Sequence, residues 1–156
     1  MLWLRLLLFL ALTAVSAGAA DLLDGRSFGG TIGPAGKRDL QDTLNFDKGH
    51  FWSDICTGCG FEPGVYAAEQ TSDGIRFTGV LRSDSRGSFT YHGLVDADGS
   101  ITVDIGWERR RWYWTTRRQI SFVGREMGES SHVDLETIRH SMRALSPDTN
   151  PLCARF

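Results

Sequence analysis

Turn motifs built on Asp and Gly recur through the middle of the chain and divide it into short segments. In a tight turn, Asp hydrogen-bonds the nearby backbone and Gly accepts the positive φ that such a turn requires. We therefore interpret these motifs as hairpin loops that join segments adjacent in sequence. The motifs are Asp47-Lys48-Gly49, Ser72-Asp73-Gly74, Asp84-Ser85-Arg86-Gly87 and Asp96-Ala97-Asp98-Gly99.

The segments between these turns alternate apolar and polar residues, as a strand with one buried face does. In the clearest case, Ile101, Val103, Ile105 and Trp107 alternate with Thr102, Asp104, Gly106 and Glu108. The same pattern predicts strands over 27–32, 42–46, 50–55, 65–70, 75–81, 89–95 and 117–123. About eight strands joined in order predict an all-β fold, an antiparallel up-and-down barrel.

Two glycines, Gly79 and Gly93, fall on the expected inner face of this barrel. Glycine weakens a strand unless the backbone bends sharply or something must approach it closely. Of these two reasons, bending is the one that we expect here.

A different pattern follows the last strand. Val133, Leu135, Ile138, Met142 and Leu145 lie near one side of a helix. The pattern predicts an amphipathic helix over 131–145, capped by Ser130 or Ser131, that lies on the barrel wall or across an open end. Pro147 would end it. The barrel and its helix then form one domain over 21–146, followed by a C-terminal tail over 147–156.

The first twenty residues have the three parts of a signal peptide. Arg5 supplies the positive end, an apolar run follows over 6–12, and small residues lead to a cleavage site after Ala19 or Ala20. The apolar run is shorter than the ~20 residues that span a bilayer. We therefore expect an exported protein, in the periplasm or outside the cell, whose mature chain has no transmembrane segment.

An exported barrel with aromatic residues on its inner face predicts a binding protein that is not an enzyme. Its ligand would be a small apolar or amphiphilic molecule held in the interior. The residues expected to line that interior are Phe28, Phe77, Phe89, Tyr91 and Trp107. A small eight-stranded barrel can also be packed solid by its own side chains, and the same residues would then form a filled core.

The mature chain resembles the calycin superfamily of small up-and-down barrels, which includes the lipocalins. Gly25-Arg26-Ser27-Phe28 stands where lipocalins carry Gly-x-Trp on the first strand. The resemblance implies a cup for a small apolar ligand, and it implies that Arg117 or Arg118 packs on the ring of Phe28. A second likeness, over 44–66, is to META-type periplasmic domains; their Cys-Asn pair is absent here, and we rank it below the first.

Cys56-Thr57-Gly58-Cys59 is the most distinctive short motif, and three interpretations compete for it. A redox enzyme would place the first Cys at a helix N-terminus after a strand. A zinc site would need further ligands, for which only Cys153 with His50 or His132 is available, at no usual zinc spacing. The third interpretation, which we favour, is a structural disulfide, either within the motif or from one of its cysteines to Cys153.

Residues 108–118 concentrate five arginines around three aromatic rings. Arginine pairs with phosphate or carboxylate, and aromatic rings stack on bases or lie at lipid headgroups. This segment predicts the alternative function, attachment to an anionic or protein partner in the cell envelope through Arg109, Arg110, Arg111, Trp112 and Trp114. The competing interpretation is an ordinary hairpin whose rings fill the barrel end and whose arginines are solvated. We favour it, because the chain as a whole has a net charge of −2.

No recognisable catalytic or cofactor motif is present. The four histidines are scattered, and no Ser, His and Asp stand in the setting of a known triad. Asp96-Ala97-Asp98-Gly99 resembles the start of a calcium loop but lacks its later acidic ligands. We therefore expect no catalytic residue, no metal, no cofactor and no specific nucleic acid binding.

Overall fold

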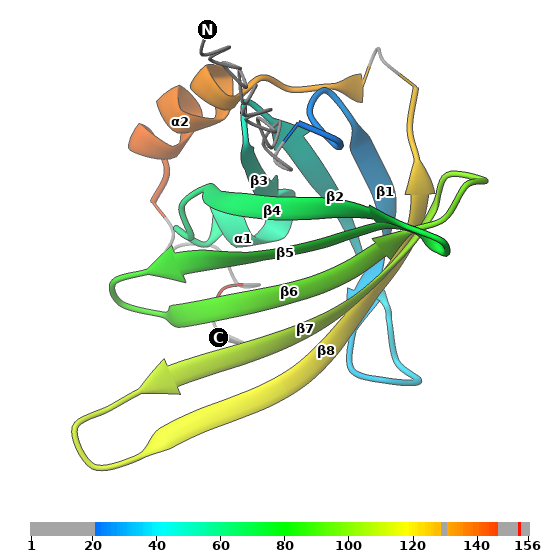
Figure 1. Cartoon of the computed structure of the whole chain (residues 1–156). Helices are drawn as coiled ribbons and strands as arrows, with labels where there is room; N and C mark the ends of the chain where they lie inside the picture. The colour runs from blue at the N-terminus through cyan, green and yellow to red at the C-terminus, as the bar shows by residue number, and fades with distance from the viewer. Residues whose placement is uncertain (1–20, 129–130, 147–152, 154–156) are drawn as a thin grey trace, which may run out of the picture.

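The computed structural model describes residues 21–128, 131–146 and 153 of the chain. Within them, eight antiparallel strands follow one another around a closed barrel, which confirms the predicted all-β fold (Figure 1). The expected signal peptide, 1–20, and all of the tail 147–156 except Cys153 lie outside the described residues. The strands are β1 (Ser27–Gly33), β2 (Leu40–Asp47), β3 (His50–Ser53), β4 (Gly64–Thr71), β5 (Gly74–Ser83), β6 (Gly87–Val95), β7 (Ser100–Arg110) and β8 (Thr115–Glu126).

The barrel closes where the first and last strands pair. β1 and β8 run antiparallel from Phe28 opposite Glu126 to Gly33 opposite Ser121. The predicted turns join neighbouring strands; in the turn between β2 and β3, Lys48 and Gly49 have φ values of 49° and 72°. Two successive residues with positive φ are typical of the hairpin turn whose twist matches that of the strands.

Aromatic rings fill the middle of the barrel. Phe46 lies at the centre of the cluster, with its ring centroid between 5.0 and 6.0 Å from those of four others. These neighbours are Phe28, Phe51, Tyr66 and Phe77. Most of the contacts are edge-to-face, the geometry that the quadrupoles of aromatic rings favour. The middle of the barrel is therefore a packed core.

The inner-face glycines make room for two of these rings. A Cβ atom at Gly79 would lie 2.3 Å from Cε1 of Phe51, and one at Gly93 would lie 2.0 Å from Cε1 of Phe77. Both distances are far inside van der Waals contact. The close approach that these glycines permit is therefore made by the protein's own phenyl rings, whereas the sequence led us to expect bending of the sheet.

A short helix, α1 (Asp54–Gly58), follows β3 and corrects the predicted strand over 50–55, which ends at Ser53. The Ser53 hydroxyl accepts a hydrogen bond from the Cys56 backbone N–H at 3.1 Å, so Ser53 caps the helix. Because β3 is so short, only two of its residues pair with β4. α1 packs against the barrel beside this short seam.

A second helix, α2 (Leu135–Arg143), is shorter than the predicted 131–145 and has a different cap. The Asp134 carboxylate accepts hydrogen bonds from the backbone N–H groups of Glu136 and Thr137, so the cap is Asp134 and not Ser130 or Ser131. The helix begins beside the β2–β3 turn, where the Leu135 backbone N–H donates to Asp47 at 2.9 Å. Leu135 is buried, whereas Leu145 remains exposed.

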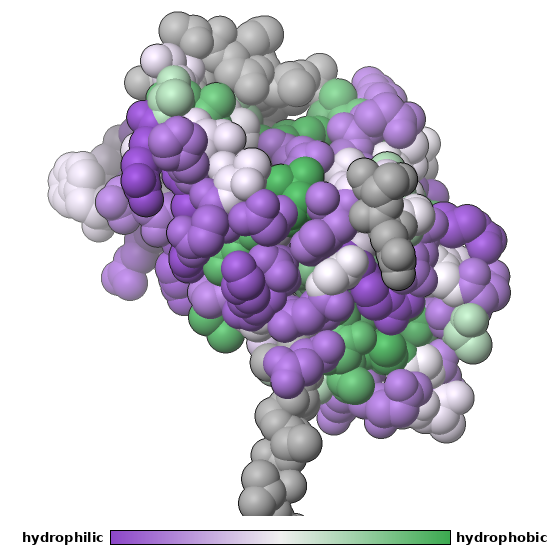
Figure 2. Space-filling view, turned by 90° about the horizontal axis from the view of Figure 1, so that it is seen from above, coloured by the Kyte–Doolittle hydropathy of each residue, from purple (hydrophilic) through white to green (hydrophobic). Residues whose placement is uncertain are grey.

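The outer surface of the barrel is largely polar. Thr102, Asp104 and Glu108 point outward from β7 and are exposed. On the face seen from above, hydrophilic residues are the most common and apolar residues form separate small groups (Figure 2). Among the described residues, no helix is both long enough and apolar enough to cross a bilayer.

Candidate functional site

The barrel contains a small apolar cavity, at the end where β1 and β7 finish and β8 begins. Its volume is about 150 Å³. The residues around it are Ile32, Gly33, Pro34, Leu40, Ile55, Cys56, Phe89, Trp107, Arg118 and Ile120. α1 supplies one wall through Ile55 and Cys56. A larger hollow of about 560 Å³ beside β4 and β5 is an open surface groove, so the cavity is the better-enclosed site for an apolar group.

The five residues predicted to line the interior all lie inside the barrel, but they divide into two groups. Phe89 and Trp107 line the cavity. Phe28, Phe77 and Tyr91 are buried in the packed part of the core, with at most 1% of their surface exposed. Ligand binding by these residues stays a prediction, and only the first two face a space that a ligand can enter.

An arginine lies at the rim of the cavity. The Arg118 guanidinium lies 5.4 Å from the Trp107 ring centroid, a cation–π distance. The indole N–H of the same tryptophan donates to the Arg86 carbonyl at 3.0 Å, which fixes the ring. The rim therefore combines a rigid aromatic wall with a positive charge.

The calycin resemblance implied that Arg117 or Arg118 would pack on Phe28, and neither does. Arg118 lies over Trp107, and Arg117 pairs with Glu108 at 2.7 Å on the outer face. The arginine over the Phe28 ring is Arg26, at 5.2 Å. Arg26 is held there by a bidentate ion pair with Glu126 of β8, so this contact closes the barrel at its other end.

A buried polar cluster that the sequence analysis missed fastens α1 to β2. Asp42 accepts hydrogen bonds from the Ser53 hydroxyl at 2.6 Å and from the Ile55 backbone N–H at 3.0 Å. Burial raises the pKa of Asp42 to about 6, although these hydrogen bonds oppose the rise. The sequence does contain a sign of this cluster. Asp42 alternates along β2 with the same period as the inward-facing Leu44 and Phe46, so its side chain is expected to point inward too.

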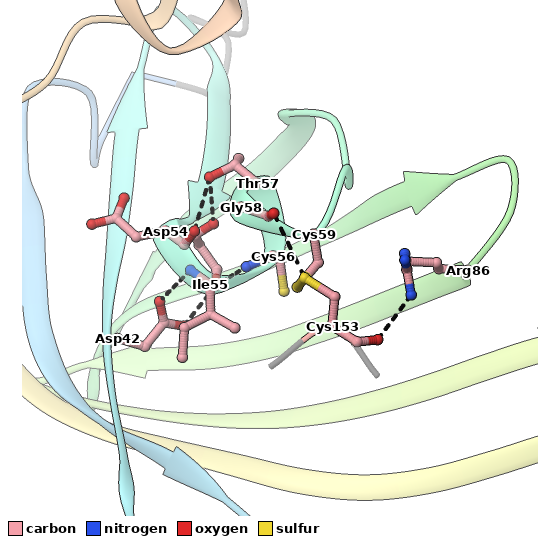
Figure 3. The surroundings of a disulfide bond; sticks show 10 residues. Asp42, Asp54, Ile55, Cys56, Thr57, Gly58, Cys59, Arg86 and Cys153 are labelled. Carbon is pink, nitrogen blue, oxygen red and sulfur yellow. Dashed lines mark hydrogen bonds between the residues drawn. A yellow bond between two sulfur atoms is a disulfide. The ribbon is translucent and has the colours of Figure 1, made fainter. Parts of the chain in front are cut away.

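The cysteines follow the interpretation that the sequence favoured. Cys59 and Cys153 form a disulfide, and Cys56 is a free, buried thiol (Figure 3). Arg86 donates to the carbonyl of Cys153 at 2.8 Å, which fastens the same point of the tail to the β5–β6 loop. Among the described residues, no group of three His, Cys, Asp or Glu side chains is placed to hold a metal ion.

Cys56 is near the start of α1, where a catalytic thiol would stand, but its surroundings suppress the thiolate. Burial and the nearby Asp42 carboxylate raise its pKa to about 12, against an ordinary value of 9.0. Its sulfur lies 3.4 Å from the hydroxyl of Tyr91, whose pKa burial also raises. This arrangement is typical of a structural cysteine.

We expect Cys56 to resist alkylation by iodoacetamide at neutral pH while the protein is folded. A pKa of about 12 leaves about a thousandth of the ordinary thiolate fraction, and burial slows the reaction further. The adduct would be counted by mass spectrometry of the native protein and of the same protein in urea, where one thiol should react readily. Rapid labelling of the native protein would contradict the structural role and would favour the hypothesis of a thiol-dependent enzyme.

The arginine-rich segment forms the end of the β7–β8 hairpin, beyond the barrel wall. Pairing of β6 with β7 stops at Ser88 opposite Glu108, whereas β7 and β8 continue to Arg110 opposite Thr115. Pairing of β1 with β8 stops at Ser121. The hairpin therefore projects as a two-stranded ribbon, as Figure 1 shows. Trp112, Tyr113 and Trp114 are exposed at its tip, so the expectation that their rings fill the barrel end is wrong.

Comparison with known proteins gave no relative: no family model, no curated protein and no solved structure matches this chain.

Proposed function

We propose that the protein is an exported, non-catalytic barrel that takes the apolar part of a small apolar or amphiphilic molecule into its end cavity. The observation that carries the proposal is the apolar cavity of about 150 Å³ lined by Phe89, Trp107 and Ile120. A cavity of about this volume, lined by Leu, Ile and Phe, stays dry in another protein and binds benzene. The group that enters would therefore be about the size of one aromatic ring or a short alkyl chain.

The rim favours an amphiphilic ligand over a wholly apolar one. Arg118 borders the cavity and is exposed to solvent, so its position suits the polar head of a ligand whose apolar chain lies in the cavity. The neighbouring hairpin adds further positive charge on the same side of the barrel. A carboxylate or phosphate head is the chemistry that such a rim would attract.

The disulfide supports the proposal of export. Disulfides persist in the periplasm and outside the cell, and Cys59–Cys153 links residues 94 apart in sequence. Export also implies removal of residues 1–20. The mass of the protein purified from the envelope or the medium checks this part of the proposal.

Binding of unbranched 1-alkanols should test the cavity directly. We expect affinity to rise by roughly fourfold for each added methylene, because burying one CH₂ contributes about 0.8 kcal/mol. The rise should stop once the cavity is full. Isothermal titration calorimetry, with the chemical shifts of the Trp107 indole as a local probe, would follow the series.

A matched pair of variants identifies the cavity as the binding site. Ile120→Trp fills part of the cavity, and we expect it to abolish alkanol binding. Val123→Trp adds the same ring on the outer face of β8, where Val123 is 40% exposed, and should leave binding intact. Equal affinity in both variants, or no dependence on chain length in the unaltered protein, would overturn the proposal.

A further inference from the structure

Three aromatic side chains in a row are exposed at the hairpin tip. Trp112, Tyr113 and Trp114 have 93%, 56% and 48% of their surfaces exposed. Neighbouring rings pack edge to face, with centroids 4.5 and 4.0 Å apart, so the tip is a single aromatic cluster. Large rings gathered on a projecting tip, away from any core, indicate a surface that contacts something outside the molecule.

The hairpin behind the tip is strongly basic. Residues 108–118 contain five arginines and one glutamate. Glu108 pairs with Arg117, and within the described part of the chain no carboxylate forms an ion pair with Arg109, Arg110 or Arg111. The partner of this hairpin should therefore be negatively charged.

The arginines stand on both faces of the ribbon, and this placement selects the kind of partner. Trp107 and Arg118 are paired on the face that continues the barrel interior, and Arg109 shares it by strand parity. Arg110 and Arg117 occupy the opposite face. A protein or nucleic acid docked against one face would leave the other set unused. A fluid layer that the tip enters end-on would meet both sets at the same depth.

We propose that the β7–β8 hairpin docks end-on to an anionic lipid bilayer. Trp112, Tyr113 and Trp114 enter the headgroup region, where amphipathic rings are favoured, and the arginines behind them contact the lipid phosphates. Because the cavity opens at the same end of the barrel, docking holds its rim near the membrane surface. The inference goes beyond the proposed cavity function and does not depend on it.

Sedimentation with vesicles tests the docking. The exported protein, lacking residues 1–20, would be mixed with vesicles of phosphatidylglycerol and phosphatidylcholine or of phosphatidylcholine alone. We expect binding to the anionic vesicles, weakening as salt rises, and much less binding to the neutral ones. Arg109→Gln with Arg110→Gln and Arg111→Gln should lower binding by about a hundredfold, at about fivefold for each arginine. Trp112→Ala with Trp114→Ala should lower it by about tenfold or more.

A control variant separates docking from general charge attraction. Lys48→Gln with Arg76→Gln and Arg143→Gln removes the same charge from exposed positions away from the hairpin and should keep binding within about twofold. Thermal unfolding should be the same for all three variants, because every altered side chain lies on the surface. Equal loss in the control, wild-type binding by the aromatic variant, or no sedimentation of the unaltered protein would each overturn the proposal. The last outcome would leave the cavity function untouched.

Discussion

Replacing Cys153 with serine is expected to lower the free energy of unfolding by about 4 kcal/mol. The disulfide to Cys59 closes a loop with a sequence separation of 94, which includes β4 to β8 and α2. A cross-link over so long a loop removes much of the conformational entropy of the unfolded chain. It also joins the tail to the end of α1, where Cys59 and Cys153 are both buried.

Urea denaturation of oxidised and reduced protein would measure this effect. Cys56→Ala should be present in every sample, since it removes the free thiol, which would otherwise be able to exchange with the disulfide. Reduction should then destabilise the protein with an intact disulfide and leave the Cys153→Ser variant unchanged. If reductant shifts both proteins equally, or neither, the disulfide is not what stabilises this end of the barrel.

The regular parts of the fold could be predicted because each strand carries its own signal. Ile101, Val103 and Ile105 alternate with polar residues, and Asp-Gly turns mark the ends of the strands. The region after His50 lacked such a signal. Phe51, Trp52 and Ile55 resemble a strand, and a helix of five residues is too short to show a helical period. Ser53 followed by Asp54 was the remaining cue for a helix start, and the longer apolar pattern obscured it.

The candidate site depends on volumes and could be predicted only in part. Phe89 and Phe77 have the same pattern in the sequence, yet one borders a cavity and the other fills the core beside Gly93. Which space stays open depends on how all the rings pack together, and no local pattern records that. The hairpin over 108–118 was predicted in part. Most of its arginines are exposed, as expected of so many charges in one segment, but Trp112, Tyr113 and Trp114 are exposed as well, whereas we expected their rings to fill the barrel end.

Stability should fall as pH rises from about 4 to about 7, and Asp42 should be the main cause. Its pKa is about 6 in the folded protein and 3.8 in an ordinary setting, because burial disfavours the charged form. Between these values the folded state holds a proton that the unfolded state has lost, so raising the pH favours unfolding. At pH values above the folded-state pKa of Asp42, this effect lowers the free energy of unfolding by about 3 kcal/mol. At pH values below the unfolded-state pKa, it does not lower it at all.

Asp42→Asn should flatten this dependence and leave the fold intact. The amide oxygen can still accept from the Thr43 and Ile55 backbone N–H groups, both of which bond to the same oxygen, Oδ1, of Asp42. The amide N–H can donate to the Ser53 hydroxyl, which now donates to the carboxylate. Asp54, whose pKa burial also raises, should leave a small residual slope.

Urea denaturation at several pH values between about 4 and 8 would compare this variant with Asp104→Asn. Asp104 is exposed on the outer face of β7, so its variant should keep the slope of the unaltered protein. An equal slope in the Asp42 and Asp104 variants would show that the Asp42 carboxyl is not the group responsible. A slope of the opposite sign in the unaltered protein would show that ion pairs such as Arg26–Glu126, which are lost at low pH, outweigh the buried carboxyl.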